Sequence, residues 1–227
     1  MIKKILVLTA LTSFSGIALA NGFYVGNAYS VDQSSIKNEV TYPLSSSIAT
    51  TQQSNLALTT VSMHFIAGYK YLRVNSPWGF EGNVDFRLTH GHNTFSIINW
   101  FNKQNASLTY TSPKAVNFSI LARYTMQRNM VVFIGPTFSI GQFKINPGAT
   151  AGDLGVSKAE SANLNGYGAT VGIDFPINHH FSLATSYRII QYNKVTWEAV
   201  EPLSGEKVRQ SITPRTQSVQ VGLIYNL

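Results

Sequence analysis

The chain contains no cysteine among its 227 residues. Disulfide bonds, thiolate metal sites and a lipid-bearing N-terminal cysteine are therefore excluded. Acidic residues are scarce too, because 10 Asp and Glu stand against 17 Lys and Arg, for a formal net charge of +7 at pH 7. The basic residues are scattered and form no run suited to nucleic acid. We expect no nucleic acid among the partners, and interpret the charge as surface electrostatics that can attract anionic lipid head groups.

Long apolar runs are also missing from most of the chain. A transmembrane helix needs about 20 apolar residues, and MVVFIG (130–135) is among the longest runs beyond the N-terminus. This argues against a helical membrane protein. At the N-terminus, Lys3-Lys4 precede a short apolar stretch, residues 5–14, and an Ala18-Leu19-Ala20 site. That order predicts a cleaved signal peptide over 1–20 rather than an uncleaved anchor helix. The mature part, 21–227, is then one domain outside the cytoplasm.

Segments in which apolar and polar residues alternate are abundant in the chain. In FEGNVDFRLTH (80–90), apolar residues and glycine alternate with polar and charged residues, and a period of two is typical of a β-strand. No convincing helical period is present. The alternating segments predict eight strands, roughly 22–31, 56–71, 80–90, 114–127, 130–145, 163–175, 181–192 and 214–227.

The connections between these segments alternate strictly between long and short. The long ones are 32–55, 91–113, 146–162 and 193–213, and the short ones carry turn residues such as Asn75-Ser76-Pro77. Within 91–113, TFSIINW (94–100) and ASLTYT (106–111) predict a strand pair that extends beyond the main sheet. Short turns at one end and long loops at the other are the plan of an outer-membrane β-barrel.

Alternation alone does not say which face is inside, because a soluble sandwich or lipocalin alternates as well. Two features favour a membrane barrel. One face lacks Asp, Glu, Lys and Arg along each segment, as expected where a charge at mid-membrane costs about 2–4 kcal/mol. The other face is rich in Gly, Ala and Ser, which suits a narrow interior. The apolar face includes Val61, Met63, Phe65, Ala67, Tyr69, Val116, Phe118, Ile120, Ala122, Tyr124, Val132, Ile134, Phe138, Ile140, Tyr167, Ala169, Val171, Ile173, Phe175, Phe181, Leu183 and Tyr187.

Aromatic residues near the short turns predict an interfacial girdle. This set is Phe23, Tyr24, Tyr69, Tyr71, Trp78, Phe80, Phe175, Phe181 and Tyr225. The C-terminal SVQVGLIYNL also alternates up to its last residue, through Val219, Val221, Leu223, Tyr225 and Leu227.

These segments together resemble the OmpA/OmpX-like and opacity-protein superfamily of small eight-stranded outer-membrane β-barrels. The resemblance covers about 22–227 and is carried by GFYVGNAYS, SLATSYRIIQYN and SVQVGLIYNL. It implies an all-β, up-and-down antiparallel barrel in the outer membrane of a Gram-negative bacterium. It also implies that the C-terminal residues are an assembly signal, read by the barrel assembly machinery, although such signals usually end in Phe rather than Leu.

Pro136 lies inside the predicted fifth strand. Proline donates no ladder hydrogen bond, and a closed barrel has no free edge on which to place it. We therefore predict a β-bulge near Gly135-Pro136.

Charged residues on the inward face form the main candidate site, a salt-bridge network in the lumen: Lys70, Glu81, Asp85, Arg87, Arg123, Asp174 and Arg188. His64 is expected to join this set. Charges in a narrow lumen must pair. The predicted hairpin makes Lys70 and Glu81 neighbours, and Arg87 and Arg123 could share Asp85 and Glu81. The interpretation we favour is a plug that rigidifies the barrel, and a gated ion or proton path is the alternative.

Catalytic and metal motifs are weak. His180-Phe181-Ser182 superficially resembles a lipid A deacylase element, but it falls at a predicted periplasmic turn, away from the outer leaflet. His90-Gly91-His92 could bind a metal, yet no carboxylate follows nearby. We predict no catalytic residues, no metal and no cofactor, hence no enzyme.

The long loops carry the remaining hint of function. Trp100, Phe101, Lys103 and Trp197 mix aromatic and basic character, which suits a glycan, lipopolysaccharide or protein partner. The resemblance implies a surface antigen or adhesion-type protein that supports envelope integrity, in contact with outer-membrane lipid and lipopolysaccharide. A host or extracellular ligand would bind through the loops. A lipid-acting enzyme, and a narrow porin-like channel or small-ligand carrier, are the alternatives.

Overall fold

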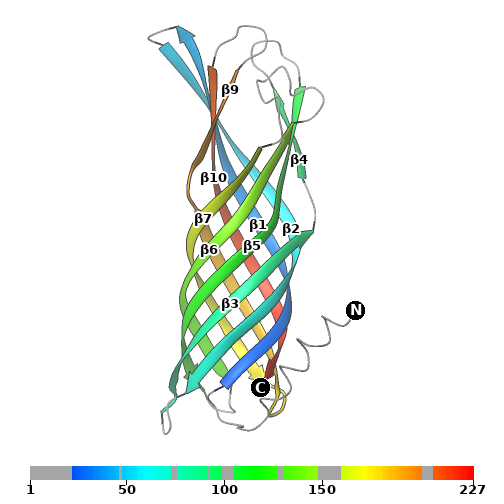
Figure 1. Cartoon of the computed structure of the whole chain (residues 1–227), viewed down its shortest axis with the longest axis vertical. Coiled ribbons are helices and arrows are strands. Elements are labelled where there is room, and N and C mark those ends of the chain that lie inside the picture. Colours follow the sequence, from blue (N-terminus) through cyan, green and yellow to red (C-terminus); the bar gives the residue numbers. More distant parts are fainter. Residues whose placement is uncertain are drawn as a thin grey trace, which may run out of the picture.

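The computed structural model describes residues 22–45, 48–72, 76–90, 93–98, 105–126, 130–147, 160–200 and 207–227. The predicted signal peptide, 1–20, lies outside this part of the chain. The described residues form ten strands (Figure 1). Their bounds are β1 Gly22–Ser45, β2 Ile48–Leu72, β3 Trp78–His90, β4 Asn93–Ile98, β5 Asn105–Thr125, β6 Val131–Pro147, β7 Glu160–Pro176, β8 Phe181–Tyr192, β9 Val195–Val200 and β10 Lys207–Asn226. Within the described ranges, no helix has the length and apolar character needed to cross a membrane.

Eight of these strands close into one antiparallel barrel. The path runs β1-β2-β3-β5-β6-β7-β8-β10, and β10 returns to pair with β1. Each strand therefore has hydrogen-bonded neighbours on both sides, which removes the free edges that an open sheet would expose. The all-β, eight-stranded fold class predicted from the alternation is confirmed.

The strands are longer than predicted at the end away from the short turns. The predicted loop 32–55 is mostly wrong, because β1 continues to Ser45 and β2 begins at Ile48, paired from Thr41↔Thr51 down to Ile36↔Leu56. Above the apolar part, the outward face of this hairpin becomes polar and its inward face mixes polar residues with Ile36 and Leu58, so the apolar-polar contrast fades although the backbone ladder continues. The predicted strand pair within 91–113 is confirmed, since β4 pairs with β5 from Asn93↔Tyr110 to Ile98↔Asn105.

The bulge predicted at Gly135-Pro136 is wrong. The β6–β7 ladder runs through both residues without a shift, as Gly135↔Thr170 and Pro136↔Ala169. On the other side, the pairing with β5 is interrupted between Ser119↔Thr137 and Ala122↔Ile134, and the register is kept. The strand thus tolerates the missing N–H of Pro136 by losing ladder contacts rather than by adding a residue.

A bulge does occur in β5, between Thr111 and Lys114, where Pro113 interrupts the ladder. The extra residue changes which side chains point inward. Below the bulge, Lys114 is exposed outside and Ala115 is buried in the lumen, and at the bulge Ser112 is buried. The irregularity therefore turns the hydroxyl of Ser112 into the barrel, whereas Lys114 keeps the outward parity of Val116.

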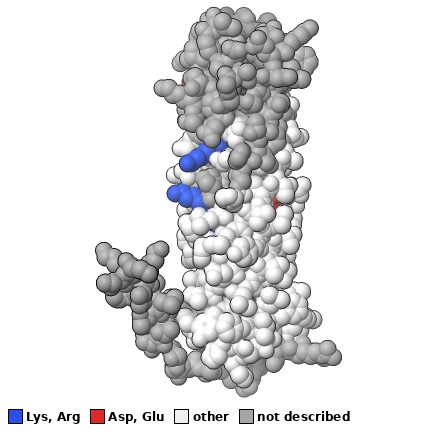
Figure 2. Space-filling model, turned by 90° about the vertical axis from the view of Figure 1, so that its right-hand side faces the viewer, with Lys and Arg blue, Asp and Glu red and all other residues white. Residues whose placement is uncertain are grey.

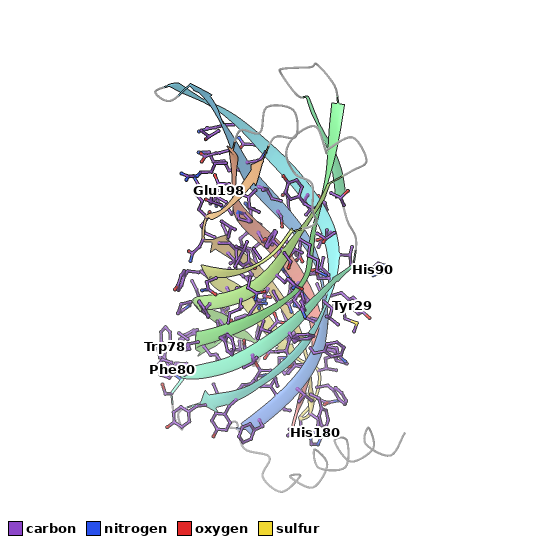
Figure 3. All side chains as sticks on the ribbon, turned by 45° about the horizontal axis from the view of Figure 1, so that its top comes forward. Tyr29, Trp78, Phe80, His90, His180 and Glu198 are labelled. Carbon is purple, nitrogen blue, oxygen red and sulfur yellow. The ribbon has the colours of Figure 1, made fainter. Side chains whose placement is uncertain are left out.

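The predicted inside and outside faces are confirmed, except that the outward face is not free of charge along each predicted segment, because Lys114, Lys144 and Arg215 are exposed on it. Large apolar side chains such as Ile120 and Phe80 are exposed on the outer wall, whereas Glu81 and Asp85 are buried. Trp78 and Phe80 project outward near the short-turn end of the barrel, and Tyr29 does so further along β1 (Figure 3). On the face drawn in Figure 2, basic side chains reach the surface only in the upper part of the described region. The girdle prediction needs one correction, because Tyr24 is 2% exposed and lies in the lumen.

Candidate functional site

The lower lumen holds a buried charge cluster built from four strands. The Arg123 guanidinium forms ion pairs with Glu81 and, at 2.7 Å, with Asp174. Lys70 forms a second ion pair with Asp174, at 3.1 Å. The hydroxyl of Tyr24 donates to Glu81. All five side chains are buried, so each charge is held by opposite charge rather than by solvent.

Asp85 is the centre of the middle lumen and is 0% exposed. Its carboxylate accepts hydrogen bonds from His64 Nδ1 at 2.9 Å, from Asn117 Nδ2 at 3.2 Å and from the Arg188 guanidinium at 2.5 Å. Arg188 also donates from Nε to Thr170, at 3.1 Å. Three donors from three other strands therefore converge on one carboxylate.

The upper lumen contains an acid that the sequence reasoning missed. Asp32 is 1% exposed, accepts hydrogen bonds from Ser30 and Ser62, and lies 3.6 Å from Arg87. Arg87 also donates to Ser112, the residue that the β5 bulge turns inward. The signal was present in the sequence, because Asp32 continues the inward period of Ala28 and Ser30 on β1. Asp32 was missed because the first strand was predicted to end at residue 31.

All seven residues of the predicted lumen network, and His64, are buried inside the barrel. The predicted partners are only partly right. Lys70 lies opposite Glu81 in the ladder, but its ion pair is with Asp174. Arg123 does bind Glu81, whereas Arg87 pairs with Asp32. With Asp32 included, the described lumen holds four acids against the four Lys and Arg, as a water-poor interior requires.

The lower cluster borders a cavity of about 50 Å³. Its lining includes Asn83, Arg123 and Asp174, and each of these side chains has a buried polar atom without a protein partner in the described part of the chain. A water molecule needs at least about 10–15 Å³ of such volume, so the cavity suits a few waters and is too small for an organic cofactor. The described residues hold no group of three or more His, Asp or Glu arranged for a metal ion.

An apolar layer lies above the charged network. It is formed by inward side chains at 0–2% exposure on seven strands: Ile36, Leu58, Tyr110, Phe143, Leu164, Tyr192 and Ile212. We call these residues the apolar cap. The rings of Phe143 and Tyr192 meet edge to face at 5.6 Å. The sequence reasoning predicted an inward face of small and charged residues, and the cap corrects it, because large apolar side chains occupy that face toward the upper ends of the strands. Four of them, Leu58, Phe143, Leu164 and Tyr192, lie within the predicted segments.

The middle lumen also contains a serine-histidine-aspartate chain. Ser30 Oγ lies 2.8 Å from His64 Nε2, and His64 Nδ1 donates to Asp85. This is the connectivity of a hydrolase triad. However, Ser30 is 3% exposed, and its hydroxyl donates its single hydrogen to Asp32, at 2.7 Å. The chain is enclosed beneath the apolar cap, where no substrate carbonyl can approach Ser30.

The other candidates do not assemble into sites. His180 is exposed and stacks on Tyr225, whereas Ser182 is buried in the lumen, so the two do not face each other. His90 is exposed at the upper end of β3 (Figure 3), and His92 lies outside the described residues. Trp100, Phe101 and Lys103 also lie outside them, as does the side chain of Trp197.

A polar cluster joins β9, β10 and β1 outside the barrel wall. Glu39 accepts hydrogen bonds from Lys194 at 2.6 Å and from Gln53 at 3.2 Å, and pairs with Lys37 at 3.0 Å. These lysine contacts, that of Lys194 first, lower the pKa of Glu39 from 4.5 to about 2. Arg209 pairs with Glu198, which Figure 3 places in the upper part of the molecule. The cluster fixes the strand extensions to one another.

Comparison with known proteins agrees with this architecture. A family model described as "Outer membrane protein beta-barrel domain" matches residues 6–226. Neisserial surface protein A is similar in structure, with a TM-score of 0.51 at 14% identity over 91% of this chain and 97% of its own. The outer membrane protease OmpT of Escherichia coli also has a TM-score of 0.51, at 8% identity over 91% and 97%. OprG of Pseudomonas aeruginosa has a TM-score of 0.48 at 15% identity over 91% and 95%. No curated protein sequence matched the chain.

Proposed function

The chain belongs to the outer membrane protein beta-barrel domain family, and from that premise we propose that it is a surface protein of adhesion type. It lies in the bacterial outer membrane. In this proposal the barrel is a closed anchor that also supports the envelope, and the strand extensions above the membrane carry the recognition.

The observation that carries the proposal is that two layers close the lumen, the charged network and the apolar cap. Four ion-paired acids and four ion-paired bases occupy its lower, middle and upper parts, and the apolar cap lies above them. A solute would have to break buried ion pairs, at about 3–5 kcal/mol for each one, and also pass through a packed apolar layer. Transport through the barrel is therefore disfavoured, and a role for the outer surface is favoured.

The β1–β2 hairpin supports a recognition role. In the described part of the chain, β2 pairs with β1 from Ile48 onward, but its pairing with β3 begins only at Val61. One edge of the 48–60 segment thus has backbone groups without a strand partner among the described residues. The segment has no charged residue or proline, the usual devices that protect an edge. An extended segment of a partner could add to this edge as a further strand.

Truncation of the hairpin tests the proposal. Val40 lies opposite Gln52, so residues 41–51 can be replaced by an Asn-Gly turn without changing the register. Bacteria displaying the wild-type protein should bind cultured cells or matrix-coated surfaces better than bacteria displaying the truncated form. A control variant carries an exchanged turn at 178–180, at the other end of the barrel. Equal binding by all three strains, at matched surface levels, would count against an adhesion role.

The barrel assembly machinery is the proposed partner of the C-terminal strand. Val219, Val221, Leu223 and Tyr225 are exposed on the outer wall, so this face is accessible before the barrel closes. Replacing the terminal Leu227 by Phe, the usual final residue of such signals, should raise the amount of folded protein in the outer membrane. A drop after that replacement would contradict this role.

A further inference from the structure

The outer wall changes sharply from apolar to basic at one level of β5 and β6. On β5 the outward residues run from Phe118 through Val116 to Lys114, and on β6 from Phe138 through Ile140 to Lys144. Both lysines are exposed. They are the first charged outward residues above the apolar wall of these two strands.

The two lysines are close enough to act together. Lys114 lies opposite Gln142 in the ladder, so Lys144 is its diagonal neighbour on the adjacent strand. Such neighbours have Cα atoms about 7–8 Å apart, and a lysine side chain can bend its ammonium group across that distance. Lys114 keeps the outward parity of Val116 and Phe118, because the bulge begins only above it, between Thr111 and Lys114.

Among the described side chains, no acid competes on this part of the wall. β5 and β6 contain no Asp or Glu, and Glu81 and Asp85 of β3 and Asp174 of β7 are buried in the lumen. The side chain of Glu160, at the start of β7, lies outside the described residues. The lysines of the β1–β9–β10 region differ, because Lys37 and Lys194 are both engaged with Glu39. Lys114 and Lys144 have no acidic partner among the described side chains.

An aromatic platform lies directly below the lysine pair. Phe118 and Phe138 stack with ring centroids 6.4 Å apart, and Phe138 meets Tyr167 of β7 at 5.2 Å. Phe118 and Tyr167 are 43% and 63% exposed on the outer wall. Phe118 and Lys114 are about 14 Å apart along the strand, at 3.4 Å per residue. An amphiphile with an anionic head and acyl chains along the barrel wall matches this arrangement.

We propose that Lys114 and Lys144 bind a phosphate of a phosphorylated glycolipid in the outer leaflet, while Phe118, Phe138 and Tyr167 contact its acyl chains. The occupant is a lipid A-type molecule, because the lysines lie at the end of the barrel that carries the long extensions, where the outer leaflet meets the wall. Two ammonium groups match the charge of one phosphate. The interaction between the lysines and the phosphate is electrostatic, so salt weakens it.

Native mass spectrometry of the full-length folded protein tests this site. The probes are bisphosphorylated lipid A, the same lipid without its phosphates, and phosphatidylglycerol. The test variant combines Lys114→Ala with Lys144→Ala. The control combines Lys37→Ala with Arg209→Ala, which removes the same charge from exposed positions beside acids. Heat-modifiable gel migration establishes that each protein is folded.

The wild type and the control should bind bisphosphorylated lipid A at least about tenfold more tightly than the test variant, because each basic residue at a membrane surface contributes about fivefold. Removing the phosphates should abolish the difference. Equal affinity of the test variant and the wild type would overturn the proposal, and so would an equal loss in the control. Equal binding of phosphatidylglycerol would overturn the assignment to a glycolipid. None of these outcomes depends on adhesion, which the hairpin truncation tests separately.

Discussion

Replacing Asp85 by Asn removes the charge at the centre of the lumen and keeps the shape of the side chain. Asp85 is 0% exposed and is the only carboxylate that Arg188 contacts among the described ion pairs. The substitution also places an amide donor where His64, Asn117 and Arg188 all donate. Removing one partner of a buried ion pair costs about 3–5 kcal/mol. We expect the free energy of unfolding to fall by that amount.

Urea unfolding of the protein in lipid vesicles, followed by tryptophan fluorescence and gel mobility, measures this loss. Asp85→Asn should lower the midpoint strongly, while Lys37→Ala, at a side chain that is 50% exposed, should leave it nearly unchanged. Adding Arg188→Met to Asp85→Asn removes the stranded cation and should recover about 2 kcal/mol or more. The reasoning is refuted if Asp85→Asn changes the free energy by less than about 1 kcal/mol, or if the second substitution only adds to the damage.

Three further predictions follow. A methyl group at Gly168 would collide with the backbone carbonyl of Ile189, whereas at Gly82 it would meet nothing within 4 Å. Gly168→Ala should therefore destabilise the barrel by about 1–3 kcal/mol in the same urea assay, and equal midpoints for Gly168→Ala and Gly82→Ala would be inconsistent with this packing. The pKa of Glu39 is lowered to about 2, so its contacts contribute fully above its ordinary pKa of 4.5 and are lost only as the pH falls through about 2. Hydrogen exchange should show the β9–β10 pairing intact at pH 3, where a glutamate with its ordinary pKa of 4.5 would already be protonated, and opening at that pH would contradict the assignment. A fluorophosphonate probe should not label Ser30 in the folded protein, and labelling that disappears in Ser30→Ala would instead indicate an accessible nucleophile.

Much of the barrel could be predicted from particular residues. Phe80, Val84 and Phe86 alternate with Glu81, Asp85 and Arg87, and once the strand closes into a barrel this parity fixes which side chains face lipid. The same parity would have found Asp32, had the first strand been continued past residue 31. Where the outward face turns polar, as on the β1–β2 hairpin, the contrast between faces disappears, and the prediction of loops there was wrong.

Irregularities of the backbone were harder to predict from the sequence. Both Pro113 and Pro136 interrupt a strand, and each lacks the N–H that a ladder requires. Only the backbone around them decides whether the strand bulges, as at Pro113, or loses pairs in register, as at Pro136. The consequence at Pro113 lies in the lumen, because the bulge turns Ser112 inward, where it accepts a hydrogen bond from Arg87.

The sequence by itself determined the strand class through its period of two and the antiparallel meander through its alternation of long and short connections. It determined which face lies inside through the lack of charge on one face and the small residues on the other. The tertiary structure alone decided the partners. Asp85 and Arg188 are 103 residues apart, and Lys70 and Asp174 are 104 apart. Their contacts form across the lumen, at heights set by the register of several successive hairpins. The pattern within single strands does not specify how these registers add up, so of the predicted pairs only Arg123–Glu81 formed, and Asp32 and the apolar cap were missed.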